Sequence, residues 1–249
     1  PHSPIDHDIT RKNLPPAWSE KGSNTYLLGT DTLGRDLLSR IIYGARVSLT
    51  VAAVSLLSGT VIATLLAITA GYFGGIVDEI ISRIVDIWLG LPFIMVALIL
   101  YLALGGSLAT IAILLVLLAW TGGYRNVRAE VLSLKTRDYV LMAKVVGAPT
   151  RWIFLKHLLP GVLNTVIVLA TLRVSSLILA EAFLSFLGAG IPPPTPSWGN
   201  MIAEGRSYLR DAWWISVFPG IALILTSAAL SFLGDWIRDF TDPRLRHIE

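Results

Sequence analysis

Cysteine is absent from the sequence and charged residues are scarce, and these two properties exclude several classes of protein. Because none of the 249 residues is cysteine, the chain has no disulfide, thiolate metal site or cysteine nucleophile. Charged residues make up 15% of the chain, against about 25% in an ordinary soluble domain, whereas 54% are hydrophobic. The mean hydropathy is +0.67, and the apolar residues gather in long uncharged runs. The composition therefore predicts a membrane protein.

Sequence motifs for catalysis are missing as well. The chain has no GxxxxGK[ST] phosphate-binding loop, no HExxH and no GxSxG. Two of its four histidines, His2 and His7, lie near Asp6 and Asp8, and we expect these four residues to form a polar tail rather than a metal site. The sequence therefore predicts a protein that is not an enzyme and that binds no metal or cofactor itself.

Five stretches are long and apolar enough to cross a bilayer as helices, since a hydrocarbon core about 30 Å thick needs roughly 20 helical residues. The run 87–124 is too long for one helix, and Gly105, Gly106 and Ser107 near its middle predict a helical hairpin. The first arm of this hairpin is expected to begin near Ile76 and to bend at Pro92. The chain is thus predicted to be all-α, with spans at 48–70, in the two hairpin arms, at 158–188 and at 212–234.

Lysine and arginine are concentrated between the third and fourth predicted spans, where seven of them lie. By the positive-inside rule, this loop and the C-terminus are expected in the cytoplasm and the N-terminal segment outside. An external segment without a signal peptide needs a preceding span, so we expect a sixth transmembrane helix before Pro1. The predicted regions are an extracytoplasmic segment 1–47, a transmembrane domain 48–234 and a cytoplasmic tail 235–249.

Within the N-terminal segment, residues 31–43 have the pattern of a short amphipathic helix. Asp31 is a favourable N-cap and Gly44 a favourable residue after the last turn. Leucine and isoleucine residues share one face, whereas Arg35 and Arg40 lie on the other. We expect this helix to lie at the membrane interface.

The basic loop 125–160 is expected to form two short helices. Helix-forming residues run from Thr136 to Val146, the triplet Gly147-Ala148-Pro149 interrupts them, and a second helix is expected from Thr150 to Pro160. This pair is apolar on one side, through Val140, Val146, Trp152 and Phe154. Paired helices of this kind are typical of a segment that docks in the groove of a partner protein.

The spacing within this loop resembles that of the EAA loop in the permease subunits of binding-protein-dependent ABC importers. Ala143, Gly147, Leu159 and Pro160 match that spacing. Other segments resemble the C permease of the branch that imports dipeptides, oligopeptides and nickel. They are LGTDTLGRD at 28–36, YGARVSL at 43–49, AGYFGG at 70–75, EAFLSFLG at 181–188, PSWG at 196–199, GD at 234–235 and DPRL at 242–245.

The resemblance implies a type I ABC importer permease fold in the cell membrane and one half of a translocation pathway for di- or oligopeptides. It implies four partners: a second homologous permease, two cytoplasmic ATPases that bind ATP and Mg, and an extracytoplasmic substrate-binding protein. Ala143 would allow close approach, Gly147 would form the turn, and Pro160 would end the second helix before the next span. The implied coupling residues are Tyr139, Ala143, Gly147, Ala148, Pro149, Arg151, Leu159 and Pro160.

Three residues within the predicted spans are candidates for the pathway itself: Arg173, Glu181 and Pro92. An arginine inside a span usually faces the bundle and has a function. Arg173 could contact a peptide carboxylate in the pathway, or it could pair with Glu181 about two turns along the same helix. The sequence leaves both interpretations open.

Other functions also remain open from the sequence. Within the importer family, nickel, glutathione or a short oligosaccharide is an alternative substrate, because selectivity would reside largely in the binding protein. A secondary transporter would need no ATPase, and a membrane scaffold or channel subunit would fit the composition. Neither of these classes explains a cytoplasmic helix pair with a Gly-Ala-Pro elbow.

Overall fold

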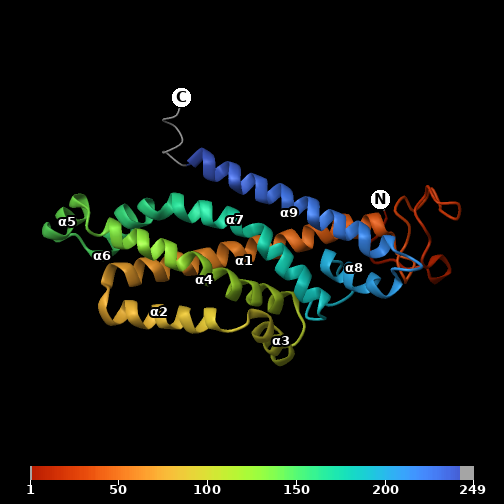
Figure 1. Ribbon diagram of the computed structural model, residues 1–249, viewed down its shortest axis with the longest axis horizontal. Helices are drawn as coiled ribbons and strands as arrows, with labels where there is room; N and C mark the ends of the chain where they lie inside the picture. Colours follow the sequence, from red (N-terminus) through yellow and green to blue (C-terminus); the bar gives the residue numbers. More distant parts are fainter. Residues whose placement is uncertain (1, 242–249) are drawn as a thin grey trace. The chain divides into compact units, whose positions relative to one another are not determined.

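The computed structural model describes residues 2–241, and its regular structure is helical apart from one isolated antiparallel bridge between Thr30 and Asp36 (Figure 1). The predicted tail residues 242–249, including the DPRL segment, lie outside the described residues. The elements are η1 (Ile9–Arg11), α1 (Leu37–Phe73), α2 (Gly75–Gly90), α3 (Phe93–Leu104), α4 (Leu108–Leu134), α5 (Asp138–Val145), α6 (Thr150–Ile153), a π-helical turn (Phe154–Leu158), α7 (Leu159–Phe186), α8 (Trp198–Gly205), η3 (Arg206–Tyr208) and α9 (Trp214–Thr241).

The predicted all-α membrane architecture is confirmed. Four helical stretches are long and apolar enough to cross a membrane: α1, α4, the run Thr150–Phe186 that ends with α7, and α9. The bent pair α2 and α3 makes a fifth when counted as one broken span. The break lies at Leu91 and Pro92, and the hairpin turn lies at Gly105–Ser107 between α3 and α4, as the sequence predicts.

The chain divides into two compact units. One unit comprises residues 1–54, 96–114 and 175–229, and the other comprises 55–95, 115–174 and 230–249. Helices α1, α4, α7 and α9 contribute residues to both units, so each unit is built from segments far apart in the sequence.

In the first unit, the N-terminal segment packs against α8 and the start of α9. The indole Nε1 of Trp214 donates to the carbonyl oxygen of Thr30 at 3.2 Å, and that of Trp198 donates to Ile41 O at 3.0 Å. Burying two indoles with their N–H groups bonded fixes the segment at little polar cost. The apolar cluster beside them consists of Leu37, Met201, Ala212, Trp214 and Ile215, with Leu28, Ile41 and Phe218 packed against it.

The short helix predicted at 31–43 is wrong at both ends. The helix begins at Leu37, and Asp36 acts as its cap, because its carboxylate accepts from the backbone N–H of Ser39 at 3.1 Å. The helix continues through Gly44, where an ideal Cβ would lie 3.4 Å from the Trp198 ring. A helical glycine costs about 1 kcal/mol relative to alanine, and tertiary packing against α8 offsets that local preference.

The arginines on the predicted polar side of this segment are buried as well. Arg35 and Arg40 are buried, with 6% and 1% of their surface exposed, whereas Leu33 is exposed. Both guanidinium groups reach the carboxylates of Asp31 and Glu204, at 2.6 Å from Arg35 to Asp31 and 2.9 Å from Arg40 to Glu204. Two acidic partners thus neutralise two buried cations, which allows the polar side to face inward.

The core of the second unit is formed by α1, α2, α4, the α5–α6 region and α7. Small residues let helices approach closely: an ideal Cβ on Gly71 would lie 2.7 Å from the Val131 side chain. Lys135 Nζ donates to Gly71 O at 2.7 Å, which satisfies a carbonyl near the end of α1. The buried cluster comprises Ala67, Ile68, Ala70, Val85, Tyr124, Val127, Val131, Val140, Ala143, Ile153, Leu158 and Val162.

Candidate functional site

The loop between α4 and α7 forms the predicted pair of helices, α5 and α6, which lies at one end of the second unit in Figure 1. Asp138 in the first turn of α5 and Lys144 in its last turn complement the helix dipole. The N-cap of α6 is Pro149, and the helix begins at Thr150. Proline suits this position because its fixed φ and missing N–H cost little at a helix start.

Gly147 forms the elbow between the two helices. Its φ is +75°, in the left-handed region that favours glycine. Gly147 N donates to Lys144 O and Ala148 N donates to Ala143 O, both at 3.0 Å, which is the hydrogen-bond pattern of a Schellman motif. None of the described residues comes within 4 Å of an ideal Cβ at Gly147. Backbone conformation, not space, therefore requires glycine at this position.

The inner side of the helix pair is fixed to the core of its unit. Ala143 is buried in the cluster together with Ile153, and Ala148 packs against it. The Phe154 ring meets Tyr72 edge to face with centroids 5.0 Å apart, and Lys144 Nζ lies 4.6 Å from the centre of the same Tyr72 ring. A displacement of the pair must therefore move the end of α1 as well.

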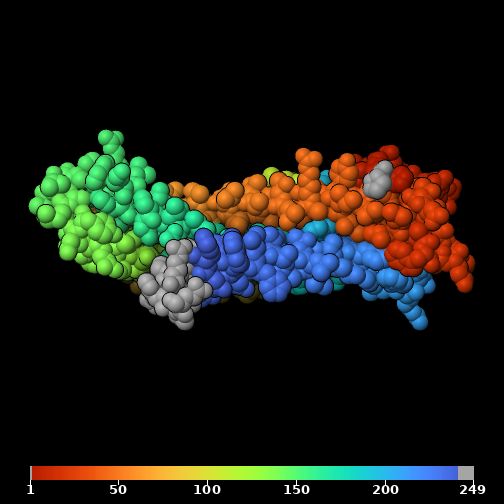
Figure 2. Space-filling view, turned by 90° about the horizontal axis from the view of Figure 1, so that it is seen from above, coloured from red at the N-terminus to blue at the C-terminus, as the bar shows by residue number. Residues whose placement is uncertain are grey.

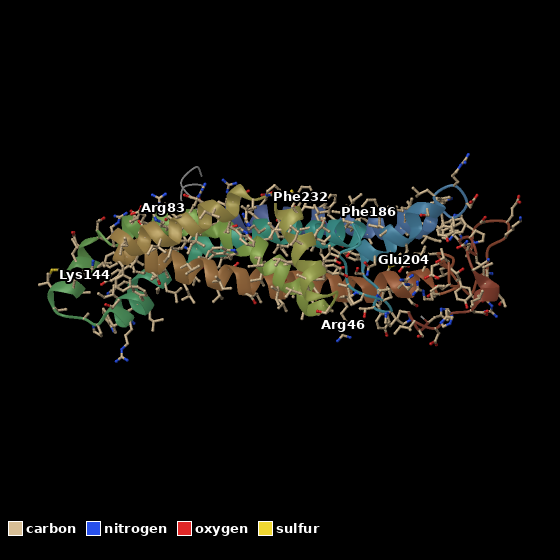
Figure 3. All side chains as sticks on the ribbon, turned by 90° about the horizontal axis from the view of Figure 1, so that it is seen from below. Arg46, Arg83, Lys144, Phe186, Glu204 and Phe232 are labelled. Carbon is tan, nitrogen blue, oxygen red and sulfur yellow. The ribbon has the colours of Figure 1, made fainter. Side chains whose placement is uncertain are left out.

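The outer side of the pair is apolar and exposed, and its green surface is visible in Figure 2. The prediction that Val140, Val146, Trp152 and Phe154 share one side is wrong, because Val140 and Phe154 pack inward whereas Val146 and Trp152 face outward. Lys144 lies near the tip of the pair (Figure 3). We call the exposed set the outer patch: Tyr139, Leu141, Met142, Val145, Val146, Trp152 and Leu155.

An aromatic row crosses the outer patch. The His157 ring lies 5.4 Å from Tyr139 and 4.9 Å from Trp152, measured between centroids. Arg151, a predicted site residue, is exposed beside Trp152. The patch thus combines large apolar side chains with a cation, a composition typical of the centres of protein interfaces.

The prediction that Pro160 ends the second helix is wrong. α6 passes through a π-helical turn, in which Leu159 N donates to Phe154 O, directly into α7, and Pro160 is the second residue of α7. Proline is tolerated there because the wider turn already interrupts the regular pattern of N–H to carbonyl bonds. Leu159 is partly buried against the core cluster, so the second helix and the span form one continuous element.

Arg173, the first candidate pathway residue, lies in the second unit beside Gly122, which has no side chain. An ideal Cβ on Gly122 would lie 1.6 Å from Arg173 Cζ, so the guanidinium occupies the space that a side chain would need. Nη1 of Arg173 also reaches Leu118 O at 3.5 Å. The adjoining cavity is about 20 Å³, room for one water molecule, and is lined by Thr60, Ala63, Thr64, Ala119, Gly123, Val127, Val166, Leu169, Ala170 and Arg173.

The other two candidate pathway residues have different surroundings. Glu181 is fully buried in the first unit, and its carboxylate oxygens accept from the hydroxyls of Ser48 at 3.0 Å and Ser185 at 2.9 Å. These two hydroxyls satisfy the buried carboxylate. Pro92 is exposed at the break between α2 and α3. Glu181 thus belongs to the first unit, and Arg173 and Pro92 belong to the second.

Two features of the helix pair escape prediction from the sequence. The contact of Lys144 with Tyr72 joins residues far apart in the chain, and no local pattern indicates it. The π-helical turn has one signal, Pro160 directly after a helix-forming run, which indicates an irregular turn as well as a helix end. Among residues 2–241, no group of three His, Asp or Glu side chains is placed to hold a metal ion.

Comparison with known proteins identifies a family and several relatives of this chain. Residues 36–247 match the model of a protein family described as the inner membrane component of binding-protein-dependent transport systems. The dipeptide transport system permease protein DppC of Bacillus subtilis strain 168 is 42% identical over 247 residues, which is 99% of this chain and 75% of that protein. DppC of Escherichia coli K12 is 42% identical over 246 residues, covering 99% and 82%.

A third relative is named for both dipeptides and tripeptides. The di/tripeptide transport system permease protein DppC of Pseudomonas aeruginosa is 40% identical over 247 residues, covering 99% of this chain and 82% of that protein. Among solved structures, an inward-facing form of the MetNI methionine ABC transporter matches with a TM-score of 0.65 at 21% identity, covering 83% of this chain and 98% of the matched chain. An amino acid ABC transporter solved with histidines matches with a TM-score of 0.61 at 12% identity, covering 81% and 94%. These two structures share the fold of this chain.

Proposed function

This chain belongs to the family of inner-membrane components of binding-protein-dependent transport systems, and we propose that it is the permease subunit of an ATP-driven importer of di- and oligopeptides. Its relatives named for dipeptides or di/tripeptides are 40–42% identical over 99% of the chain, which supports that substrate class. In this role the chain is a non-catalytic subunit, and partner subunits bind ATP and Mg. It forms half of the pathway together with a second, homologous permease.

The observation that carries this proposal is the α5–α6 pair, with its fixed inner side and exposed outer patch. In the proposed mechanism the outer patch docks in a groove of a cytoplasmic ATPase, where Tyr139, Trp152 and Arg151 are the main contacts. Closure of the ATPases around ATP then displaces the pair. Because the pair is bonded to the core of its unit, the displacement moves the spans between inward and outward access.

The positions of the loop residues suggest their roles in this mechanism. Ala143 is buried where a larger side chain would force α5 away from the core, and Gly147 with Ala148 closes the elbow. Pro149 caps α6, and Leu159 with Pro160 connects it to the span. We further propose that this loop and the C-terminus are cytoplasmic, and that a substrate-binding protein delivers peptide to the opposite face.

Reconstitution tests the proposal. Two ATPases, the second permease and this chain are inserted in liposomes, and radiolabelled alanylalanine is supplied with its binding protein. We expect uptake that requires ATP and that stops when Trp152 and Leu155 are both changed to Asp, because the charges would disrupt an apolar interface. The control is Leu27→Asp, at an exposed position outside the membrane spans. Uptake without ATP, or an unchanged double variant, would contradict the proposal.

A further inference from the structure

A second polar feature of the second unit lies between α2 and α4, outside the helix pair. It is a groove of about 390 Å³, within the range of roughly 300–1,000 Å³ that ligand sites occupy. Five residues line it: Ser82, Asp86, Tyr124, Arg125 and Arg128. Cations, a carboxylate and hydroxyls therefore face one space.

The spacing of the polar residues places them on one side of α2. Asp78, Ser82 and Asp86 are four residues apart and so form one stripe, and the salt bridges show that this stripe faces α4. The isoleucines at 76, 80, 84 and 87 are exposed. Ionisable residues in a span are costly, so such a stripe is retained for internal pairing or for contact with a polar ligand.

The two salt bridges of the groove differ in strength. Arg128 holds Asp78 with two contacts of 2.5 Å, from Nε and Nη2, and the two side chains are 30% and 15% exposed. Ser82 Oγ donates to the same carboxylate at 3.3 Å and contacts Tyr124 Oη at 3.0 Å. A bidentate, partly buried pair with added hydroxyls is a rigid frame.

The second salt bridge, between Arg125 and Asp86, is exposed and opens easily. Arg125 Nη2 touches Asp86 Oδ1 in a single contact of 2.6 Å, and the side chains are 64% and 59% exposed. Exposed pairs of this kind contribute little, because water competes for both charges. Opening the pair presents one cation and one anion to the groove at small cost.

We infer that this groove is a transient binding site for the charged ends of a free peptide, with Arg125 receiving the α-carboxylate and Asp86 the α-ammonium. The inference rests on the proposed function as a peptide importer. A zwitterionic peptide replaces each half of the ion pair by a group of the same charge, so no charge is left unpaired during the exchange. The binding is necessarily weak, as a translocation pathway requires, because the peptide competes with the ion pair itself.

Substitutions at Asp86 and Arg125 test this inference. In the reconstituted importer, Asp86→Asn and Arg125→Gln are each expected to lower the rate of alanylalanine uptake about tenfold, since each removes a charge-assisted hydrogen bond. Arg125→Lys keeps the positive charge but loses the planar guanidinium group, which can donate two parallel hydrogen bonds. We expect the uptake rate to fall about threefold. The decisive variant exchanges the two charges, Asp86→Arg with Arg125→Asp, which keeps the ion pair but reverses its direction. Uptake is not expected to recover, because the peptide would have to bind in the opposite orientation.

The matched control is the exposed salt bridge between Glu79 and Arg83 on the same helix. Its N–O distance is 2.9 Å, and neither residue lines the groove. Exchanging those two charges should leave uptake unchanged. Full recovery in the Asp86/Arg125 exchange, or wild-type uptake in all groove variants, overturns the inference. Defects that appear only when the liposomes contain phosphatidylethanolamine would assign the groove to a lipid headgroup instead. Absence of uptake by the wild-type complex would overturn the proposed function, and this inference with it.

Discussion

Changing Gly147 should uncouple ATP hydrolysis from transport while leaving the protein folded. A non-glycine residue at φ +75° costs about 1–2 kcal/mol. The alternative is to abandon the elbow, which loses two backbone hydrogen bonds, together about 2 kcal/mol. Because the two costs are similar, valine should populate a mixture of native and rearranged elbows, whereas asparagine, which tolerates this conformation, should keep the native one.

The assay is the ratio of ATP hydrolysed to peptide imported in the reconstituted complex. We expect the ratio to rise in the order Asn, Ala, Val at position 147. Because 1 kcal/mol shifts the melting temperature of a chain this long by about 2–4 °C, each variant should still unfold cooperatively within several degrees of the wild type.

Gly188 provides the matched control. It follows α7 with φ +90°, Gly188 N donates to Ser185 O at 3.0 Å and Ala189 N to Leu184 O at 2.9 Å, and none of the described residues lies within 4 Å of an ideal Cβ. Gly188→Val should therefore cost similar stability without changing the ratio. A wild-type ratio in Gly147→Val, or equal uncoupling by Gly188→Val, would refute the reasoning.

Three further tests address the packing within each unit. Asp31→Asn leaves two buried arginines short of a counter-charge and should cost about 3–5 kcal/mol in thermal unfolding, whereas the exposed control Asp6→Asn should cost almost nothing. Glu181→Leu should destabilise by about 1–3 kcal/mol more than Glu181→Gln, and equal losses would argue against the hydroxyl bonds. Gly122→Ala should be destabilising alone but nearly neutral when Arg173→Ala is added, as a double-mutant cycle would show.

Breaks in the helices were predictable because local residues determine them. Gly105, Gly106 and Ser107 interrupt an apolar run, and Pro92 has no N–H to continue a helix. The elbow at Gly147 is equally local, since a glycine before Ala-Pro favours a left-handed end. These signals act within a few residues, and the structure follows them.

The faces of the helices were not predictable in the same way. Arg35 and Arg40 turn inward because Glu204, more than 160 residues later in the chain, supplies a carboxylate. The inward side of α5 is set by Tyr72 and the rest of the core cluster, which only the tertiary fold brings together. Amphipathic pattern alone assigns the apolar side inward, which fails when buried charges find partners.

The π-helical turn at Phe154–Leu158 sets the rotational phase between α6 and the span. Such a turn holds one residue more than an α-helical turn, and one residue corresponds to about 100° around a helix axis. Deleting a single residue there would restore regular winding and swing Trp152 by about that angle relative to α7. The direction in which the chain presents its outer patch is thus encoded in one surplus residue.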